Sequence, residues 1–249
     1  DRVVTLVPGT GSSLRDLGRT SERAEAICEA VGTVEAAGTA EAAASAGSVG
    51  SAESSAGRPE TVDARTECVA VSWQGYDAPQ SIPEAAGSLG RATAHAADLR
   101  TYAAGLDAVE SMDGRDAPHT AVGYSFGSAV LGSAASDPRG LAADRMIHVG
   151  SPGAGVGSIA DQWVDEGGVA RRATDREVVG AATRWDPVPW WSLTGVLGER
   201  PGTSTFGGLG VDVTEPGSGP HSVSGAHSAY FDPGTVSLEE IGRLVADSD

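Results

Sequence analysis

The sequence predicts an α/β fold in which helices cover both faces of a mainly parallel β-sheet. Short apolar segments rich in β-branched residues alternate along the chain with longer, helix-like segments. Several apolar segments are hydrophobic throughout, as expected for strands that are buried on both faces. The chain has 249 residues, of which 40% are hydrophobic, and this is enough for one domain with a buried core. Because such sheets bind ligands at the carboxyl ends of their strands, we expect the functional site at that edge.

The individual elements follow from their apolar patterns, taken in chain order. Strands are expected where a short, β-branched segment is bounded by polar or Gly/Pro-rich sequence. They are 3–7, 68–73, 120–123, 145–149, 177–183 and, with a weaker pattern, 209–213. Helices are expected where longer segments carry apolar residues at helical spacing. They are 14–31, 88–112, 128–135 and 238–246.

One segment departs from this alternation. Residues 33–60 are almost entirely Ala, Gly, Ser, Thr and Glu, and Val34 and Val49 are their only larger apolar side chains. A segment of this composition can bury little surface. We therefore expect a low-complexity, flexible insertion after the first helix, with marginal helix around 36–46, within a single domain that spans 1–249.

The charge of the chain excludes some partners. It contains 34 acidic and 17 basic residues, which gives a net charge of −17. This charge argues against binding to nucleic acid or anionic lipid through a basic surface. Every basic residue is Arg, and the absence of Lys and Asn fits either GC-rich coding or a salt-loving host. No apolar run approaches the ~18 residues of a membrane span, so we expect a soluble protein.

Cysteine usage and the start of the chain bear on the compartment. Cys28 and Cys68 match no metal-ligand spacing, and two free thiols are the favoured interpretation. The alternative is a disulfide that closes the loop between them, which would imply an oxidising compartment. The chain starts at Asp1 without an initiator Met, so we expect a trimmed or processed chain. A cytoplasmic protein and a secreted one both remain open.

The strongest chemical signal is Gly123-Tyr124-Ser125-Phe126-Gly127, a G-x-S-x-G pattern. The bare pattern is weakly specific in a chain with 35 glycines, but here a strand precedes it and a helix follows it. That context is the sharp strand-to-helix turn that presents a nucleophilic serine. The alternative is an ordinary Gly-Ser loop that leads into a helix. We take Ser125 as the candidate nucleophile.

A serine hydroxyl needs a base to take its proton and a carboxylate to orient that base. In this topology the partners follow the serine in the order acid, then histidine, which leaves His221 and His227. His95 and His119 come too early, and His148 lies within an apolar strand, where packing is its expected role. His227, shortly before the last helix, is favoured over His221, although both could be surface loop residues.

Asp186 is the candidate acid, because it follows a strand directly in the segment Trp185-Asp186-Pro187. Its other interpretation is a turn-forming Asp before Pro, and Asp212 and Asp232 are held in reserve. The oxyanion that forms on the substrate needs two backbone N–H donors. We expect these from Thr10, in the loop after the first strand, and from Phe126.

Other motifs are weaker. The glycines around Thr10 could cradle a phosphate, but the Lys of a Walker motif and a full dinucleotide fingerprint are missing, so no cofactor is expected. No metal site is expected either. Aromatic residues near the catalytic loops could line an acyl or leaving-group pocket, or could equally be core or lid packing. They are Trp73, Tyr76, Trp190 and Trp191.

Taken together, these motifs resemble the α/β-hydrolases, and in particular an actinobacterial family of such domains without an assigned function. The resemblance rests on Val-Pro-Gly-Thr-Gly at 7–11, Trp73 to Pro79, the Gly123–Gly127 pattern, Val149 to Gly153, Asp186-Pro187-Val188 and His227 to Phe231. It covers nearly the whole chain and implies Ser125, Asp186 and His227 as a catalytic triad. Residues 33–60 depart from it as an extra insertion.

The sequence therefore predicts a serine hydrolase that cleaves an ester or related acyl bond of a small molecule through an acyl-serine. Two alternatives remain open. One is a binding or scaffold protein that keeps the fold without turnover, since fold does not prove function. The other is acyl transfer, or cleavage of amide or thioester bonds, by the same triad. The natural substrate and the oligomeric state are left open.

Overall fold

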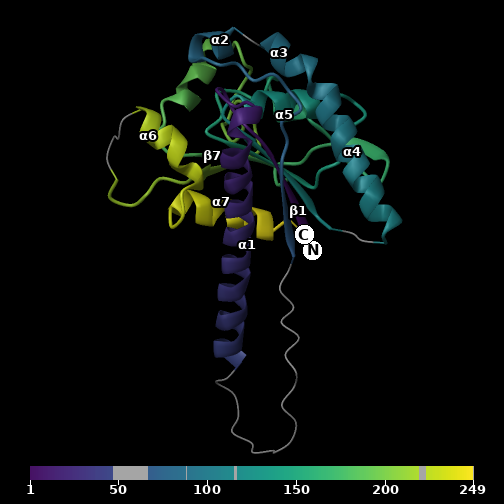
Figure 1. Ribbon diagram of the computed structural model, residues 1–249, viewed down its shortest axis with the longest axis vertical. Coiled ribbons are helices and arrows are strands. Elements are labelled where there is room, and N and C mark those ends of the chain that lie inside the picture. The colour runs from purple at the N-terminus through teal and green to yellow at the C-terminus, as the bar shows by residue number, and fades with distance from the viewer. Residues whose placement is uncertain (47–66, 88, 115–116, 219–222, 249) are drawn as a thin grey trace, which may run out of the picture.

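The computed structural model describes residues 1–46, 67–87, 89–114, 117–218 and 223–248. Within these ranges, six strands form one parallel sheet in the order β2-β1-β3-β4-β7-β8. Helices lie around this sheet (Figure 1). The strands are β1 (Arg2–Val7), β2 (Cys68–Ser72), β3 (His119–Tyr124), β4 (Arg145–Val149), β7 (Val178–Ala182) and β8 (Leu209–Asp212). All six strands expected from the sequence are present, and the prediction of a parallel sheet is confirmed.

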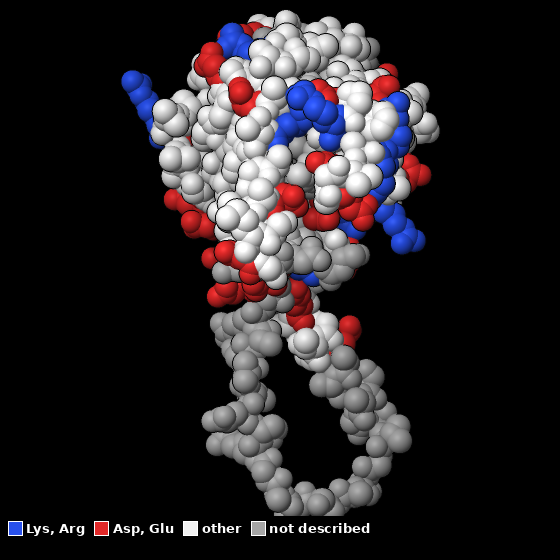
Figure 2. Space-filling model, turned by 90° about the vertical axis from the view of Figure 1, so that its right-hand side faces the viewer, with Lys and Arg blue, Asp and Glu red and all other residues white. Residues whose placement is uncertain are grey.

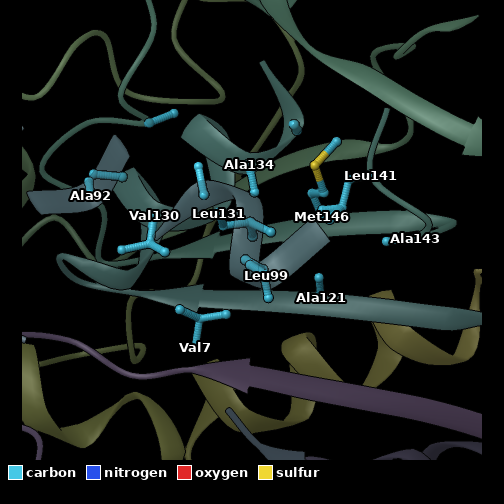
Figure 3. Close-up of a cluster of buried hydrophobic side chains, with 14 of the residues drawn as sticks. Val7, Ala92, Leu99, Ala121, Val130, Leu131, Ala134, Leu141, Ala143 and Met146 are labelled. Atoms are coloured by element: carbon cyan, nitrogen blue, oxygen red, sulfur yellow. The ribbon is translucent and has the colours of Figure 1, made fainter. Parts of the chain in front are cut away.

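Helices cover both faces of this sheet, and each face has its own apolar core. On one face, α1 (Leu17–Ala46) and α7 (Val236–Ala246) lie side by side and pack Ile27 and Ile241 against the strands. On the other face lie α3 (Leu89–Ala94), α4 (Ala96–Met112) and α5 (Gly127–Ala135). Figure 3 shows side chains of α4 and α5, including Leu99 and Leu131, gathered with Met146 of β4 in this second core.

Two helices differ from the prediction. The first begins with the short 3-10 helix η1 (Leu14–Asp16) and then continues as α1 to Ala46, so that the predicted helix 14–31 and the marginal helix expected around 36–46 form one helix. The Ala- and Glu-rich composition after residue 33 favours helix even though it buries little, and Glu35 is held by an ion pair with Arg2 at 3.4 Å. The expected insertion therefore starts as helix, and its part from 47 to 60 lies outside the described residues. The predicted helix 88–112 is broken at His95 into α3 and α4.

Several elements were not expected from the sequence. The strands β5 (Trp163–Glu166) and β6 (Val169–Arg172) form an antiparallel hairpin. The sequence signal for this hairpin is the pair Gly167-Gly168. Both glycines have positive φ in the structure, as a two-residue hairpin turn requires. The remaining short helices are α2 (Ile82–Ala86), η2 (Ile159–Asp161), η3 (Val188–Thr194), α6 (Val223–Ser228) and η4 (Ala229–Phe231).

The expectation of two free thiols is wrong. Cys28 of α1 and Cys68 of β2 form a disulfide, with their Cα atoms 5.4 Å apart. Spacing along the chain could not show this, because the contact arises only when α1 runs back along the sheet beside β2. None of the helices in the described part of the chain is long and apolar enough to cross a membrane.

Candidate active site

Ser125 sits at the turn between β3 and α5, at the carboxyl end of the sheet. Its φ is +54°, and it is the one non-glycine residue with positive φ in the part of the chain that the structure describes. An L-residue adopts this conformation at a cost of about 1–3 kcal/mol, so the surroundings must hold it. One support is a hydrogen bond from the Ser125 amide to the Val149 carbonyl, at 2.9 Å. The turn thus has the strain that the sequence pattern predicts for a nucleophile elbow.

The glycines of the pattern are required by close packing. A Cβ placed on Gly127 would lie 2.2 Å from the carbonyl oxygen of Val7 and 2.7 Å from that of Pro8. Both of these atoms are backbone and cannot rotate away. Gly127 therefore allows the start of α5 to touch the end of β1, and this contact brings the loop after β1 next to Ser125.

The structure brings Ser125, His227 and Asp186 together, although they are far apart in sequence. The Oγ of Ser125 lies 2.9 Å from Nε2 of His227, and Nδ1 of His227 lies 2.7 Å from Oδ2 of Asp186. A carboxylate can only accept hydrogen bonds, so Nδ1 carries the imidazole proton and Nε2 is left to accept from the serine hydroxyl. This is the arrangement in which a histidine can remove the proton of a serine.

The carboxylate of Asp186 is buried and held from several sides. The side chain is 0% exposed, the amide of Val188 donates to Oδ1 at 2.9 Å, and the hydroxyl of Tyr230 donates to Oδ2 at 2.8 Å. The Tyr230 hydroxyl also accepts from the amide of Thr183 at 3.1 Å. Burial raises the pKa of Tyr230, and the charge of Asp186 adds to this, so the phenol stays a donor. Sequence analysis did not identify Tyr230, whose only signal is its position three residues after His227.

Tyr124 supports His227 in a second way. Its ring is stacked on the imidazole with 5.1 Å between the ring centroids, and its hydroxyl donates to the His227 carbonyl at 2.6 Å. Burial raises the pKa of Tyr124 to about 12, and the nearby guanidinium of Arg23 opposes this rise only in part. Arg23 itself lies 5.1 Å from the centre of the Tyr124 ring. Neither Tyr124 nor Arg23 was singled out from the sequence as a site residue.

Thr10 and Phe126 line the same cavity as Ser125 and His227. Among the described residues, neither of their backbone amides donates a hydrogen bond, so both are free to bind a ligand oxygen. The loop that carries Thr10 is fixed by the Tyr76 hydroxyl, which donates to the Pro8 carbonyl, and by the Gly11 amide, which donates to Pro79 at 2.8 Å. Such preorganised donors can stabilise an oxyanion.

The cavity in front of Ser125 has a volume of about 510 Å³. Of the four aromatic residues that could either line this pocket or pack in the core or a lid, the structure places only Trp191 in the cavity lining. Trp190 lines a separate cavity of about 380 Å³ beside β7 and β8. Trp73 and Tyr76 are buried in the core, where the Tyr76 ring is stacked between those of Trp73 and Phe126. Of these two residues, Tyr76 holds the Thr10 loop through its hydrogen bond to Pro8, and the Trp73 ring packs against that of Tyr76.

The remaining histidines and the two reserve acids do not join Ser125 and His227 among the described residues. His148 is fully buried in β4, where its burial lowers the pKa to about 3, but neither ring nitrogen has a hydrogen-bond partner among the described residues. His119 contacts Thr5 at 2.9 Å, while His221 lies outside the described residues. In the same ranges neither Asp212 nor Asp232 hydrogen bonds to His227. No three His, Cys, Asp or Glu side chains of the described ranges gather as metal ligands would.

Comparison with known proteins adds one finding. A family model described as Alpha/beta hydrolase matches residues 1–180. No curated protein and no solved structure gives a significant match to the chain. The matched range includes Thr10 and Ser125 and ends before Asp186 and His227, so the contacts of those two residues rest on the geometry described above.

Proposed function

The chain belongs to the α/β-hydrolase family, and from that premise we propose that it is a serine hydrolase that cleaves a carboxylic ester through an acyl-serine intermediate. Membership of the family supports hydrolase activity in general. The observation that carries the more specific proposal is the continuous chain of hydrogen bonds from Asp186 through His227 to Ser125, at 2.7 and 2.9 Å.

In the proposed mechanism the Ser125 hydroxyl attacks the ester carbonyl while Nε2 of His227 takes the hydroxyl proton. The negative charge on the carbonyl oxygen is stabilised by the free amides of Thr10 and Phe126. Asp186 keeps the imidazole in the tautomer that can accept this proton and stabilises the imidazolium that forms. His227 then gives the proton to the leaving alcohol, which leaves the acyl group on Ser125.

In the second half of the cycle, water is the nucleophile and Ser125 is the leaving group. His227 takes a proton from a water molecule, the resulting hydroxide equivalent attacks the acyl carbonyl, and Ser125 leaves with the proton returned from His227. The same groups serve thioesters, amides and acyl transfer to an alcohol, so the class of acyl bond is set by the cavity and not by the triad. A binding protein of the same fold would need neither the strained serine nor the free amides.

Hydrolysis of 4-nitrophenyl butyrate by matched variants tests the proposal. Ser125→Ala should lower kcat by about 10⁴- to 10⁶-fold, and His227→Ala by at least about 10²-fold, because each removes one member of a unit that acts together. His221→Ala is the matched control and should stay within a few-fold of wild type. Wild-type turnover by a folded Ser125→Ala protein would contradict the proposal, and a loss at His221 with none at His227 would reassign the base.

A further inference from the structure

The cavity in front of Ser125 has a charge opposite to that of the protein. The chain carries a net charge of −17, and acidic side chains gather over the lower part of the face shown in Figure 2. The charged residues that line the cavity, however, are Arg19 and Arg23, and no Asp or Glu lines it within the described residues. A protein that otherwise repels anions thus presents cations at its candidate active site.

We infer that the substrate is an ester that carries a negatively charged acid group, bound by the guanidinium groups of Arg19 and Arg23 while Ser125 attacks the ester bond. This inference rests on the proposed function, since it names the substrate class of the same site. It makes Arg19 and Arg23 specificity-determining residues.

Arg23 is the stronger of the two cation sites. Its guanidinium lies over the rings of Tyr124 and Phe231, 5.1 and 5.7 Å from their centres, and no carboxylate of the described residues lies within ion-pair distance. Stacking on a ring occupies the face of the guanidinium and leaves the N–H donors in its plane free. Because these donors match the geometry of a carboxylate or phosphate, an anion is the ligand they fit best.

Arg19 extends this site along the helix. It lies four residues before Arg23 on α1, so the two side chains project from the same face. Its carboxylate contact is with Asp16 at 3.6 Å, and the Arg19 side chain is 68% exposed there. Such an exposed pair is weak, so a ligand anion can replace it.

The rest of the lining indicates the other half of the substrate. Apolar side chains face the cavity from three separate segments: α2, η3 and the loop that follows η3. They are Ile82, Ala85, Val188, Trp191 and Leu197. A molecule that fills the cavity therefore has an apolar part on one side of the ester and an acid group within reach of α1. Ser125 and His227 line the same cavity as both of these parts.

Two pairs of substrates test the inference, one for each side of the ester. The first pair is mono-4-nitrophenyl adipate and its primary amide, which differ only in a carboxylate on the acyl part. The second is 4-acetoxybenzoate and 4-acetoxybenzamide, which differ in a carboxylate on the alcohol part. The readout is the ratio of kcat/KM for the anion to kcat/KM for the neutral amide. The salt concentration is 0.15 M, at which interactions between exposed charges more than about 8 Å apart are largely screened.

The wild-type ratio should be about tenfold or more in one of the two pairs, as one charge-assisted hydrogen bond provides. Arg23→Gln should bring this ratio close to one, and Arg19→Gln should lower it by about threefold. Arg15→Gln removes the same charge from η1, where the side chain is outside the cavity lining, and should leave the ratio unchanged.

Three outcomes overturn the inference. A wild-type ratio of one or less in both pairs, with Ser125-dependent hydrolysis of the neutral esters intact, contradicts the substrate class and leaves the proposed function standing. An equal loss of the ratio in Arg15→Gln and Arg23→Gln would mean that general surface charge, and not contact, is responsible. Absence of Ser125-dependent hydrolysis of every ester would remove the proposed function and this inference with it.

Discussion

Removal of the disulfide between Cys28 and Cys68 should destabilise the protein without abolishing its activity. The bond joins α1 to β2 across a sequence separation of 40 residues, and both cysteines are partly buried against the core shared by α1 and α7. It lies at the edge of the sheet and away from the residues that line the cavity in front of Ser125. The substitution to test is Cys28→Ser combined with Cys68→Ser.

The expected size follows from the length of the closed loop. A cross-link that closes about 40 residues lowers the entropy of the unfolded chain enough to stabilise the fold by about 4 kcal/mol. For a domain of this size each kcal/mol shifts the thermal midpoint by about 2–4 °C. The double variant should therefore unfold about 8–16 °C below the wild type.

Thermal unfolding followed by circular dichroism, with and without a phosphine reductant, measures this effect. Reductant should lower the wild-type midpoint toward that of the double variant and should leave the double variant unchanged, which is the matched control. Ester hydrolysis at 25 °C should stay within about threefold of wild type, because the fold remains populated well below its midpoint. A midpoint shift of less than about 3 °C would refute the loop-closure argument.

Three further predictions concern the site and the core. Tyr230→Phe removes one hydrogen-bond donor to the Asp186 carboxylate, so kcat/KM for a neutral ester should fall about tenfold. A change within twofold would count against a role of Tyr230 in holding Asp186. Gly127→Ala places a Cβ 2.2 Å from the Val7 carbonyl oxygen, so the thermal midpoint should fall by about 4–10 °C and turnover should be lost. An unchanged melting curve would refute the close packing of α5 on β1 as the reason for this glycine. His148 has a pKa of about 3 in the folded protein, below the ~6.5 of an unfolded chain. Its contribution to the free energy of unfolding is therefore complete above pH ~6.5 and is lost as the pH falls, because the unfolded chain then binds a proton that the folded protein does not. The loss is about 1.4 kcal/mol at pH ~5.5. Urea unfolding at pH 7.5 and 5.5 should show this loss in the wild type and a smaller one in His148→Met; equal losses would contradict it.

The parts of the fold that the sequence predicts are those with local signals. The strands at the centre of the sheet, such as Val3 to Val7, are apolar on both faces and could be recognised without knowledge of their partners. The turn at Ser125 is also local, since two glycines and a following helix define it. The order of acid and histidine along the chain then limited the choice to a few residues.

The parts that could not be predicted depend on contacts between distant segments. Tyr124 contacts His227, and Tyr230 contacts Asp186, only in the folded chain. The spacing of these residues along the sequence does not predict either contact. Nearness in the chain was misleading for Trp73, which follows a strand end but packs into the core below the site. The cation of Arg23 reaches the cavity because α1 starts at the same edge of the sheet, again a property of the fold.

The central claim is that Ser125 is an activated nucleophile, and labelling by a fluorophosphonate probe tests it without knowledge of the substrate. Intact-mass analysis should show one probe molecule on the wild-type protein, and peptide mapping should place it on Ser125. Ser125→Ala should not react, and His227→Ala should react at least about 10²-fold more slowly, because the serine then lacks its base. A folded wild-type protein that stays unlabelled, or a Ser125→Ala protein that is labelled at the wild-type rate, would contradict the account.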